Sequence, residues 1–143
     1  MKVEQISIFL ENKPGGLEKV TRILRDVHIN IRTLAVADTS DFGIVRIIVN
    51  DVEAATKVLR ENGFTVSRTA VVAVEVPDRP GGLHSILEVI AKANVNIAYM
   101  YAFVEKSGEN AVMLFRFDEL DKAIDALVKN GISVLPGEKL YSF

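Results

Sequence analysis

The chain has 143 residues, with 17 basic and 19 acidic side chains and neither cysteine nor tryptophan. The absence of cysteine excludes disulfide bridges, thiolate metal sites and a cysteine nucleophile. A formal charge of −2 gives no electrostatic basis for binding a nucleic-acid backbone. No apolar run reaches the roughly 18 residues needed to span a membrane, and the N-terminus alternates polar and apolar residues instead of forming a signal peptide. We therefore expect a cytoplasmic protein.

The first half of the chain is predicted to form a strand, a helix, two strands, a helix and a further strand. Short β-branched apolar runs indicate the strands. Apolar residues at helical spacing, such as Leu17, Val20 and Leu24, indicate the first helix. Either Asn50 or Asp51 can cap the second helix. In chain order, the predicted spans are strand 3–10, helix 17–27, strands 29–37 and 43–49, a helix that ends at 62–63, and a strand from 64.

The second half repeats the first. Pro14-Gly15-Gly16-Leu17 returns as Pro80-Gly81-Gly82-Leu83, Asn30-Ile31 returns as Asn96-Ile97, and Asn62-Gly63-Phe64 is echoed by Asn130-Gly131-Ile132. Three landmarks in the same order indicate a duplication. The second half accordingly has predicted strands and helices at 71–76, 83–93, 95–105, 111–117, 120–129 and 132–135.

The order strand, helix, strand, strand, helix, strand is typical of the ferredoxin-like fold. In that fold two helices cover one face of a four-stranded antiparallel sheet. We therefore predict an α+β protein made of two such βαββαβ units in tandem, at residues 1–68 and 69–143. No proline or glycine occurs between Phe64 and Val76, so we expect a continuous strand to join the halves.

The sequence contains no recognisable enzyme site. The only histidines, His28 and His84, cannot form a metal-binding pair on one helix, and there is neither a nucleophile elbow nor a phosphate-binding loop. The triplet Asp41-Phe42-Gly43 lies between two predicted strands and reads as a turn. We expect no catalysis, no metal site and no cofactor.

RNA binding is a weaker alternative, because ferredoxin-like folds also include RNA-recognition modules. Such modules stack bases on aromatic residues of their central strands. The predicted strand 43–49 has no aromatic residue, and in the second half Phe115 and Phe117 flank Arg116 without the glycines of that motif.

Each half has a glycine-rich turn ahead of its first helix, preceded by a polar residue, Asn12 or Asp78. The glycines admit positive φ angles and let another group approach the backbone. The N–H groups of the following first helical turn can bind a carboxylate or another anion. Alternatively, the glycines only make a tight strand-to-helix turn. The repetition of the polar residue favours the ligand interpretation.

These motifs resemble the ACT domain, a small-molecule regulatory module of amino-acid metabolism. The Asn/Asp-x-Pro-Gly-x-Leu turn of that family is matched at residues 12–17 and 78–83, and its Asn-Ile pair at the start of the second strand is matched at 30–31 and 96–97. The resemblance covers nearly the whole chain and points to small stand-alone tandem ACT proteins.

The resemblance implies that an amino acid binds between two ACT units, under the turn of one and beside the second strand of its neighbour. Asn12 and Asp78 would hydrogen-bond the ligand, and Asp78 would be the better partner for an ammonium group. The implied ligand-binding residues are Asn12, Lys13, Gly15, Gly16, Leu17, Asn30, Ile31, Asp78, Arg79, Gly81, Gly82, Leu83, Asn96 and Ile97.

One position departs from the family pattern. Serine-binding members place a histidine two residues before the Asn, where this chain has Leu10 and Val76, which argues against a serine-like ligand. We predict a non-catalytic amino-acid sensor or regulatory protein that pairs as a homodimer. The alternative is an obligate subunit of a separate amino-acid biosynthetic enzyme, with purely structural turns.

Overall fold

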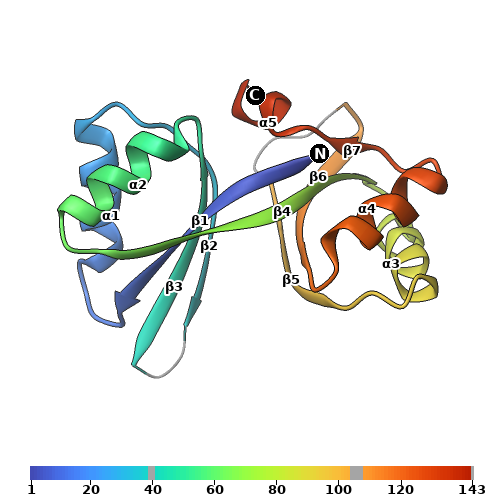
Figure 1. The fold of residues 1–143 in the computed structure, drawn as a ribbon, viewed down its shortest axis with the longest axis horizontal. Coiled ribbons are helices and arrows are strands. Elements are labelled where there is room, and N and C mark those ends of the chain that lie inside the picture. Colours follow the sequence, from blue (N-terminus) through green and yellow to red (C-terminus); the bar gives the residue numbers. More distant parts are fainter. Residues whose placement is uncertain (39–40, 104–107, 143) are drawn as a thin grey trace. The chain divides into compact units, whose positions relative to one another are not determined.

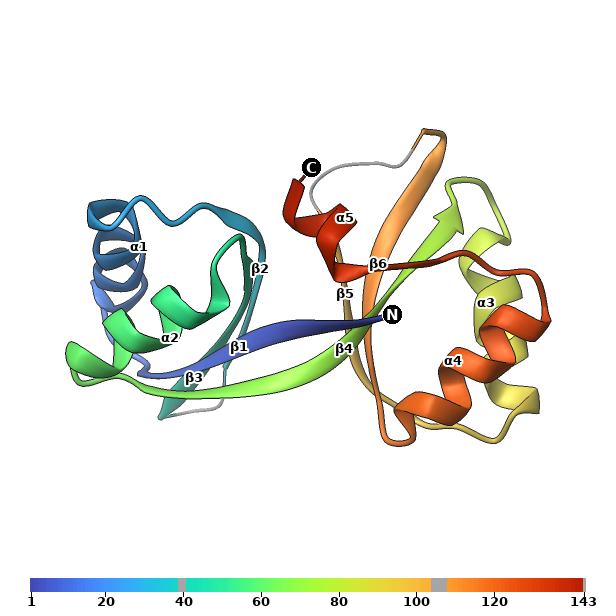
Figure 2. The ribbon, with the colours of Figure 1, turned by 45° about the horizontal axis from the view of Figure 1, so that its top comes forward.

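The computed structural model describes residues 1–38, 41–103 and 108–142. The chain divides into two compact units. The N-terminal unit comprises Glu4–Thr69, and the C-terminal unit comprises Ala70–Phe143 together with Met1–Val3. In each unit two helices cover one face of a sheet (Figures 1 and 2).

The N-terminal unit is a ferredoxin-like βαββαβ fold, as predicted. Its sheet has the order β2-β3-β1-β4, with antiparallel pairing of β3 to both β1 and β2. Helices α1 and α2 pack on the face that carries Ile6, Ile8 and Ile47. The elements are β1 (Lys2–Glu11), α1 (Gly16–Asp26), β2 (Ile31–Asp38), β3 (Phe42–Val49), α2 (Val52–Glu61) and the first residues of β4 (Thr65–Pro77).

The C-terminal unit repeats this topology. Its sheet has the order β5-β6-β4, and β7 pairs with β4 on the other side. Strand β4 continues without a break from Thr65 to Pro77, which confirms the predicted continuous strand. The further elements are α3 (Gly82–Lys92), β5 (Ile97–Ala102), β6 (Asn110–Phe117), α4 (Leu120–Lys129), β7 (Val134–Leu135) and α5 (Gly137–Ser142).

The duplication extends to the strand register. Glu11 pairs with Phe42 in the N-terminal sheet, and Pro77 pairs with Asn110 at the same place in the C-terminal sheet. A register shift between Ile31 and Thr33 recurs between Ile97 and Tyr99. The residue two before each Asn-Ile pair has a left-handed backbone, with φ of 58° at His28 and 56° at Asn94. The two units can therefore be compared position by position.

The aromatic residues of β6 belong to the core. The rings of Phe115 and Phe117 are fully buried and stack with centroids 5.3 Å apart and an interplanar angle of 3°. Both pack in the cluster that α3 and α4 cover. Because neither ring reaches the surface, β6 offers no stacking platform of the kind that RNA-recognition modules use.

Three details differ from the predicted spans. The final strand is only two residues long, and the short helix α5, which was not predicted, follows it and buries Leu140. The strand predicted over 95–105 is observed as Ile97–Ala102, and residues 104–105 lie outside the described part of the chain. The triplet Asp41-Phe42-Gly43, predicted as a turn, instead contributes Phe42 and Gly43 to β3, because both pair with the end of β1, and residues 39–40 lie outside the described part of the chain.

Candidate functional site

The two Pro-Gly-Gly turns have the same backbone geometry. Gly15 and Gly81 are the N-cap residues of α1 and α3, with left-handed φ angles of 87° and 84° and no side-chain capping hydrogen bond. The backbone N–H groups of Lys13 and Arg79 each donate to a carbonyl two residues earlier, at 2.9 Å. The first N–H groups of a helix have no partner within the helix and suit a carboxylate. In the C-terminal turn one of them, the N–H of Gly82, already donates to the Arg79 carbonyl at 3.0 Å.

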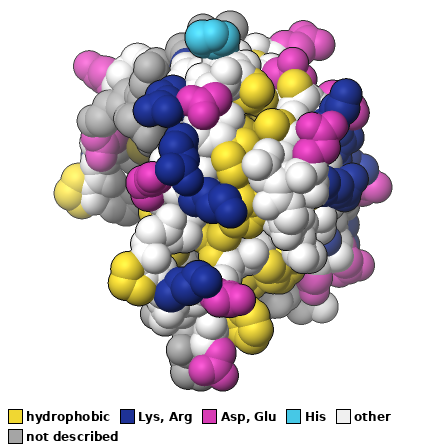
Figure 3. All heavy atoms as spheres, turned by 90° about the vertical axis from the view of Figure 1, so that its left-hand side faces the viewer, with side chains coloured by type: hydrophobic (Ala, Val, Ile, Leu, Met, Phe, Trp, Pro, Cys, Tyr) yellow, Lys and Arg dark blue, Asp and Glu magenta, His cyan; other side chains and the backbone are white. Residues whose placement is uncertain are grey.

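An open hollow of about 520 Å³ adjoins the N-terminal turn. Lys13, Gly15 and Gly16 line it, together with further cationic and aromatic side chains. The Lys13 ammonium lies 3.1 Å from Glu11, whereas Lys19 Nζ lies 5.5 Å from the ring centroid of Phe64. Figure 3 shows one face of the molecule, on which several Lys and Arg side chains lie beside a strip of hydrophobic ones. The remaining lining residues are Phe9, Leu10, Glu11, Pro14, Arg22, Phe42, Gly63 and Thr65.

The hollow beside the C-terminal turn is smaller and more apolar. It measures about 440 Å³, and Asp78, Arg79 and Leu83 line it with Val76, Pro77, Pro80, Ala111 and Met113. Gly82 is buried behind it, where a Cβ atom would overlap the Pro77 carbonyl oxygen and lie 2.9 Å from its carbon. Gly82 is therefore required for close packing, whatever else the turn does.

The Asn-Ile pairs lie away from the turns of their own units. Asn30 and Ile31 line a separate hollow of about 470 Å³ at the C-terminal end of α1. The 11 residues of α1 separate this hollow from the turn by about 16 Å. The backbone N–H of Asn30 donates to Asn50 Oδ1 at 3.1 Å, and the backbone N–H of Asn96 donates to Asp118 Oδ1 at 3.0 Å. These bonds fix the start of each second strand.

The remaining predicted site residues are mostly accessible. Asn12 is exposed, and its backbone N–H donates to the Asp41 carbonyl at 3.0 Å. Leu17 and Leu83 are 39% and 37% exposed. Gly81 and Asn96 are exposed as well, and Ile97 is half-buried. Each unit thus brings its turn residues together but holds its Asn-Ile pair at the opposite end of the helix.

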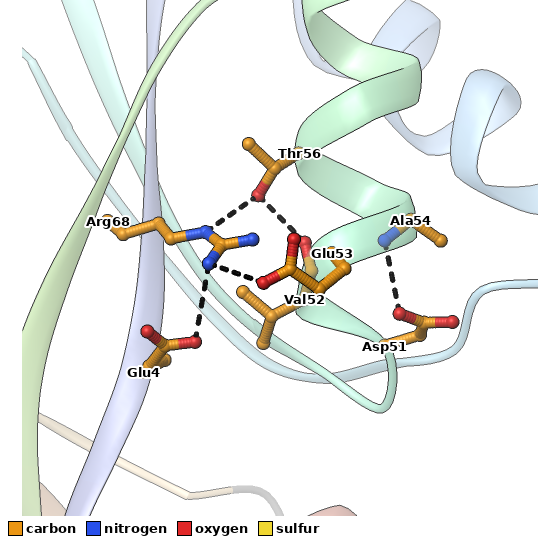
Figure 4. Close-up of polar contacts among 7 residues, drawn as sticks. All are labelled: Glu4, Asp51, Val52, Glu53, Ala54, Thr56 and Arg68. Atoms are coloured by element: carbon orange, nitrogen blue, oxygen red, sulfur yellow. Dashed lines mark hydrogen bonds and ion pairs between the residues drawn. The ribbon is translucent and has the colours of Figure 1, made fainter.

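A further hollow of about 610 Å³ is lined by residues of α2 and by Arg68 of β4. Arg68 pairs there with two carboxylates (Figure 4). Arg68 Nη1 lies 2.8 Å from Glu53 Oε1 and 3.8 Å from Glu4, and Arg68 Nε donates to Thr56 at 3.3 Å. The hydrogen bond from Arg68, followed by its positive charge, lowers the pKa of Glu53 below the ordinary value of a glutamate. Through these contacts Arg68 ties β4 to α2 and β1.

Neither a metal-binding cluster nor a membrane-spanning helix is found in the part of the chain that the structure describes. No group of three or more His, Asp or Glu side chains there could hold a metal ion. None of the helices in residues 1–38, 41–103 and 108–142 is long and apolar enough to cross a membrane.

A family model described as an ACT domain pair matches residues 1–143. The chain belongs to this family. A Bacteroides thetaiotaomicron protein of known crystal structure is 38% identical, with a TM-score of 0.93 over 100% of this chain and 98% of that chain. Regulatory subunits of aspartate kinase from Thermus thermophilus (ligand-free form) and Thermus flavus share the fold, with TM-scores of 0.62 and 0.61. They are 17% and 16% identical over 88% of this chain and 91% and 90% of theirs. A search of curated proteins gave no significant match.

Sequence motifs predicted Lys13 but not the other cationic and aromatic residues that surround the turn of the N-terminal ACT unit. Phe9 and Phe42 look like ordinary strand residues, and Lys19 looks like an ordinary residue on the solvent side of a helix. A position-by-position comparison of the two repeats could have found them, because the second ACT unit has Glu75, Asn110 and Ser85 at the corresponding positions.

Proposed function

We propose that this ACT domain pair is a non-catalytic, cytoplasmic regulatory protein that reversibly binds an amino acid at its Pro-Gly-Gly turns. The observation that carries this proposal is the hollow of about 520 Å³ beside Gly15 and Gly16. Exposed N–H donors of α1 and the cations Lys13, Lys19 and Arg22 all border it. This combination suits a carboxylate, the group that every amino acid carries.

A bound amino acid would regulate by shifting a conformational equilibrium. A ligand moves such an equilibrium only by the difference between its affinities for the two states. Residues of the turn, such as Lys13 and Asp78, are exposed and can change their contacts when a ligand arrives. A partner that recognises one state would then be bound or released.

Thermal unfolding with each of the twenty amino acids at millimolar concentration tests the proposal. A ligand that binds only the folded chain stabilises it by mass action, by about 2.7 kcal/mol at a hundred times its Kd. We expect one or a few amino acids to raise the Tm, and the corresponding amines without a carboxylate to have no effect. Unchanged melting curves for all twenty would contradict amino-acid binding.

A second function is favoured by Gly82, whose packing against Pro77 gives at least one turn a structural purpose. The chain would then be an obligate regulatory subunit of a separate biosynthetic enzyme. The Thermus relatives, whose names describe them as regulatory subunits of aspartate kinase, support this alternative. Co-purification of one enzyme with the tagged chain from its own cells, without added ligand, would distinguish this function from a free sensor.

We further propose that the protein is a homodimer that pairs through β2. This strand is the edge of the N-terminal sheet, and Leu34 and Val36 on it are 44% and 56% exposed. Their cross-strand partners, Ile47 and Val45, belong to the core, so both exposed side chains extend the apolar face of the sheet. A second copy aligned antiparallel would cover both the apolar side chains and this edge of the sheet.

A further inference from the structure

The duplication provides an internal control for the hollow beside the N-terminal turn. The two units have the same strand register, with Glu11 opposite Phe42 and Pro77 opposite Asn110. A residue that the fold itself requires should therefore have a similar counterpart in the other unit. An exposed residue that differs in chemistry from its counterpart is not required by the fold, and it is a candidate for contact with a ligand.

Two phenylalanines in the N-terminal hollow have no aromatic counterpart in the C-terminal unit. Phe9 and Phe42 lie on the same face of neighbouring strands, and they are 43% and 57% exposed. The corresponding residues of the C-terminal unit are Glu75 and Asn110, and Asn110 Nδ2 donates to Glu75 Oε2 at 3.0 Å. The same backbone thus forms with a hydrogen-bonded polar pair in place of the two aromatic rings.

The cations of this hollow differ between the units in the same way. Lys19 corresponds to Ser85, whose hydroxyl donates to the Gly82 carbonyl at 2.8 Å, and Arg22 corresponds to Glu88. Arg22 lies 3.5 Å from Glu18, but among the described residues no carboxylate pairs with Lys19. The N-terminal hollow therefore combines an uncompensated ammonium group with exposed aromatic rings, whereas the residues that line the C-terminal hollow include one cation, Arg79, and no aromatic ring.

We infer that the N-terminal hollow selects an aromatic carboxylate, such as an aromatic amino acid or an arylacetic acid. The carboxylate binds Lys19 and the N–H groups of the turn, and the aromatic body of the ligand packs against Phe9 and Phe42. This inference rests on the proposed function, since it names the class of ligand for the same site. It leaves the C-terminal turn, with its different lining, for another ligand or for none.

The test is calorimetric titration of the full chain with four probes: phenylacetate, L-phenylalanine, L-leucine and phenethylamine. Two variants, Phe42→Asn and Lys19→Ser, replace a residue of the N-terminal hollow by the residue at the corresponding position of the C-terminal unit. Val128→Gln, at a 48% exposed apolar position of α4, is the matched control. All three positions are at least partly exposed, and a urea titration of each variant confirms that it is folded.

We expect the wild-type chain to bind phenylacetate and L-phenylalanine more tightly than L-leucine, and not to bind phenethylamine. Phe42→Asn should weaken the binding of both aromatic probes about 3- to 10-fold and leave L-leucine unchanged. Lys19→Ser should weaken every carboxylate probe about tenfold, and Val128→Gln should change nothing.

The outcomes separate this inference from the function on which it rests. If L-leucine binds as tightly as L-phenylalanine and Phe42→Asn has no effect, selection of aromatic ligands is wrong while amino-acid binding stands. If the aromatic probes bind but neither variant weakens them, the ligand sits elsewhere and the inference fails. If no probe and none of the twenty amino acids binds, the proposed function fails as well.

Discussion

Gly16 and Gly82 occupy the same position in the two turns, yet their surroundings differ. A Cβ atom on Gly16 would lie 3.7 Å from the Glu11 carbonyl oxygen, an ordinary contact, whereas one on Gly82 would overlap the Pro77 carbonyl. Gly82→Ala should therefore destabilise the protein by about 1–3 kcal/mol, the typical cost of overpacking. Gly16→Ala should be neutral or stabilising by up to about 1 kcal/mol, because alanine is the better helix former.

Urea denaturation of the two variants beside the wild type measures this difference. Gly16→Ala is then also the suitable probe of ligand access to the N-terminal turn, since it adds a methyl group without disturbing the fold. Equal losses of stability in the two variants would show that the turns are packed alike.

The bond between Glu53 and Arg68 predicts a pH dependence of stability. The hydrogen bond from Arg68, and then its charge, lowers the pKa of Glu53 in the folded protein. A carboxyl whose pKa is lower when folded stabilises the fold above its unfolded pKa, about 4.3 for glutamate. That stability is lost as the pH falls through the folded value. Glu53→Gln should therefore lower the stability at pH 7 and reduce its decline in acid.

The control for this pH dependence is Glu61→Gln, on the same helix and lining the same hollow. Within the part of the chain that the structure describes, Glu61 has no ion pair, so its substitution should leave the acid decline as in the wild type. Urea midpoints measured between pH 7 and pH 3 compare the three proteins. An identical pH dependence in wild type and Glu53→Gln would show that the bond contributes nothing to the fold.

The helices and strands that were predicted well have strong local signals at their ends. Asp51 caps α2 by accepting a hydrogen bond from the Ala54 N–H at 3.1 Å, and Gly63 follows that helix with a φ of 83°. By contrast, α5 has only six residues, and its burial of Leu140 depends on tertiary packing that no short apolar pattern reveals.

The residues of the candidate site differ in the same way, because only some of them have a local sequence signal. The turns could be predicted because proline and glycine have local conformational meaning at those positions. Phe9 and Phe42 could not be predicted from a local motif, because each follows the ordinary alternation of its strand, and only comparison with Glu75 and Asn110 of the other repeat distinguishes them. The proximity of the two phenylalanines depends on the register that sets Glu11 opposite Phe42, which is a property of the assembled sheet.

Strand β2 gives a prediction about assembly. If two copies pair along this edge, adding charge to both exposed positions should separate them, because like charges would face one another across the two-fold axis. Light scattering during size-exclusion chromatography should give about twice the monomer mass of 15.7 kDa for the wild type and the monomer mass for the double variant Leu34→Lys, Val36→Lys.

Val128→Lys is the control for assembly, because it adds charge at an exposed apolar position of α4, away from β2. It should remain a dimer. A wild-type chain that elutes as a monomer at micromolar concentration, or a double variant that remains dimeric, would rule out pairing through this edge.

The two turns of the chain have the same backbone geometry but are lined by different side chains. Their affinities for a ligand should therefore be unequal. The N-terminal hollow has three cations and one carboxylate, whereas Asp78 and Arg79 stand beside apolar residues in the C-terminal hollow. Asp78 offers a charge-assisted hydrogen bond to an α-ammonium group, which Asn12 at the matching position cannot do. Titration with an amino acid that raises the Tm should therefore resolve two classes of site, or a single site per chain.

The variant Asp78→Ala shows which class of ligand site belongs to the C-terminal turn. If the C-terminal turn binds the ammonium group, this variant should weaken one class by about 1–3 kcal/mol, the range for a hydrogen bond to a charged group. The other class should keep its affinity, because the lining of the N-terminal hollow is unchanged. Asp78 is exposed, so a urea titration should give nearly wild-type stability. Two identical sites that Asp78→Ala weakens equally would mean that the shared backbone of the turns, and not their different side chains, determines binding.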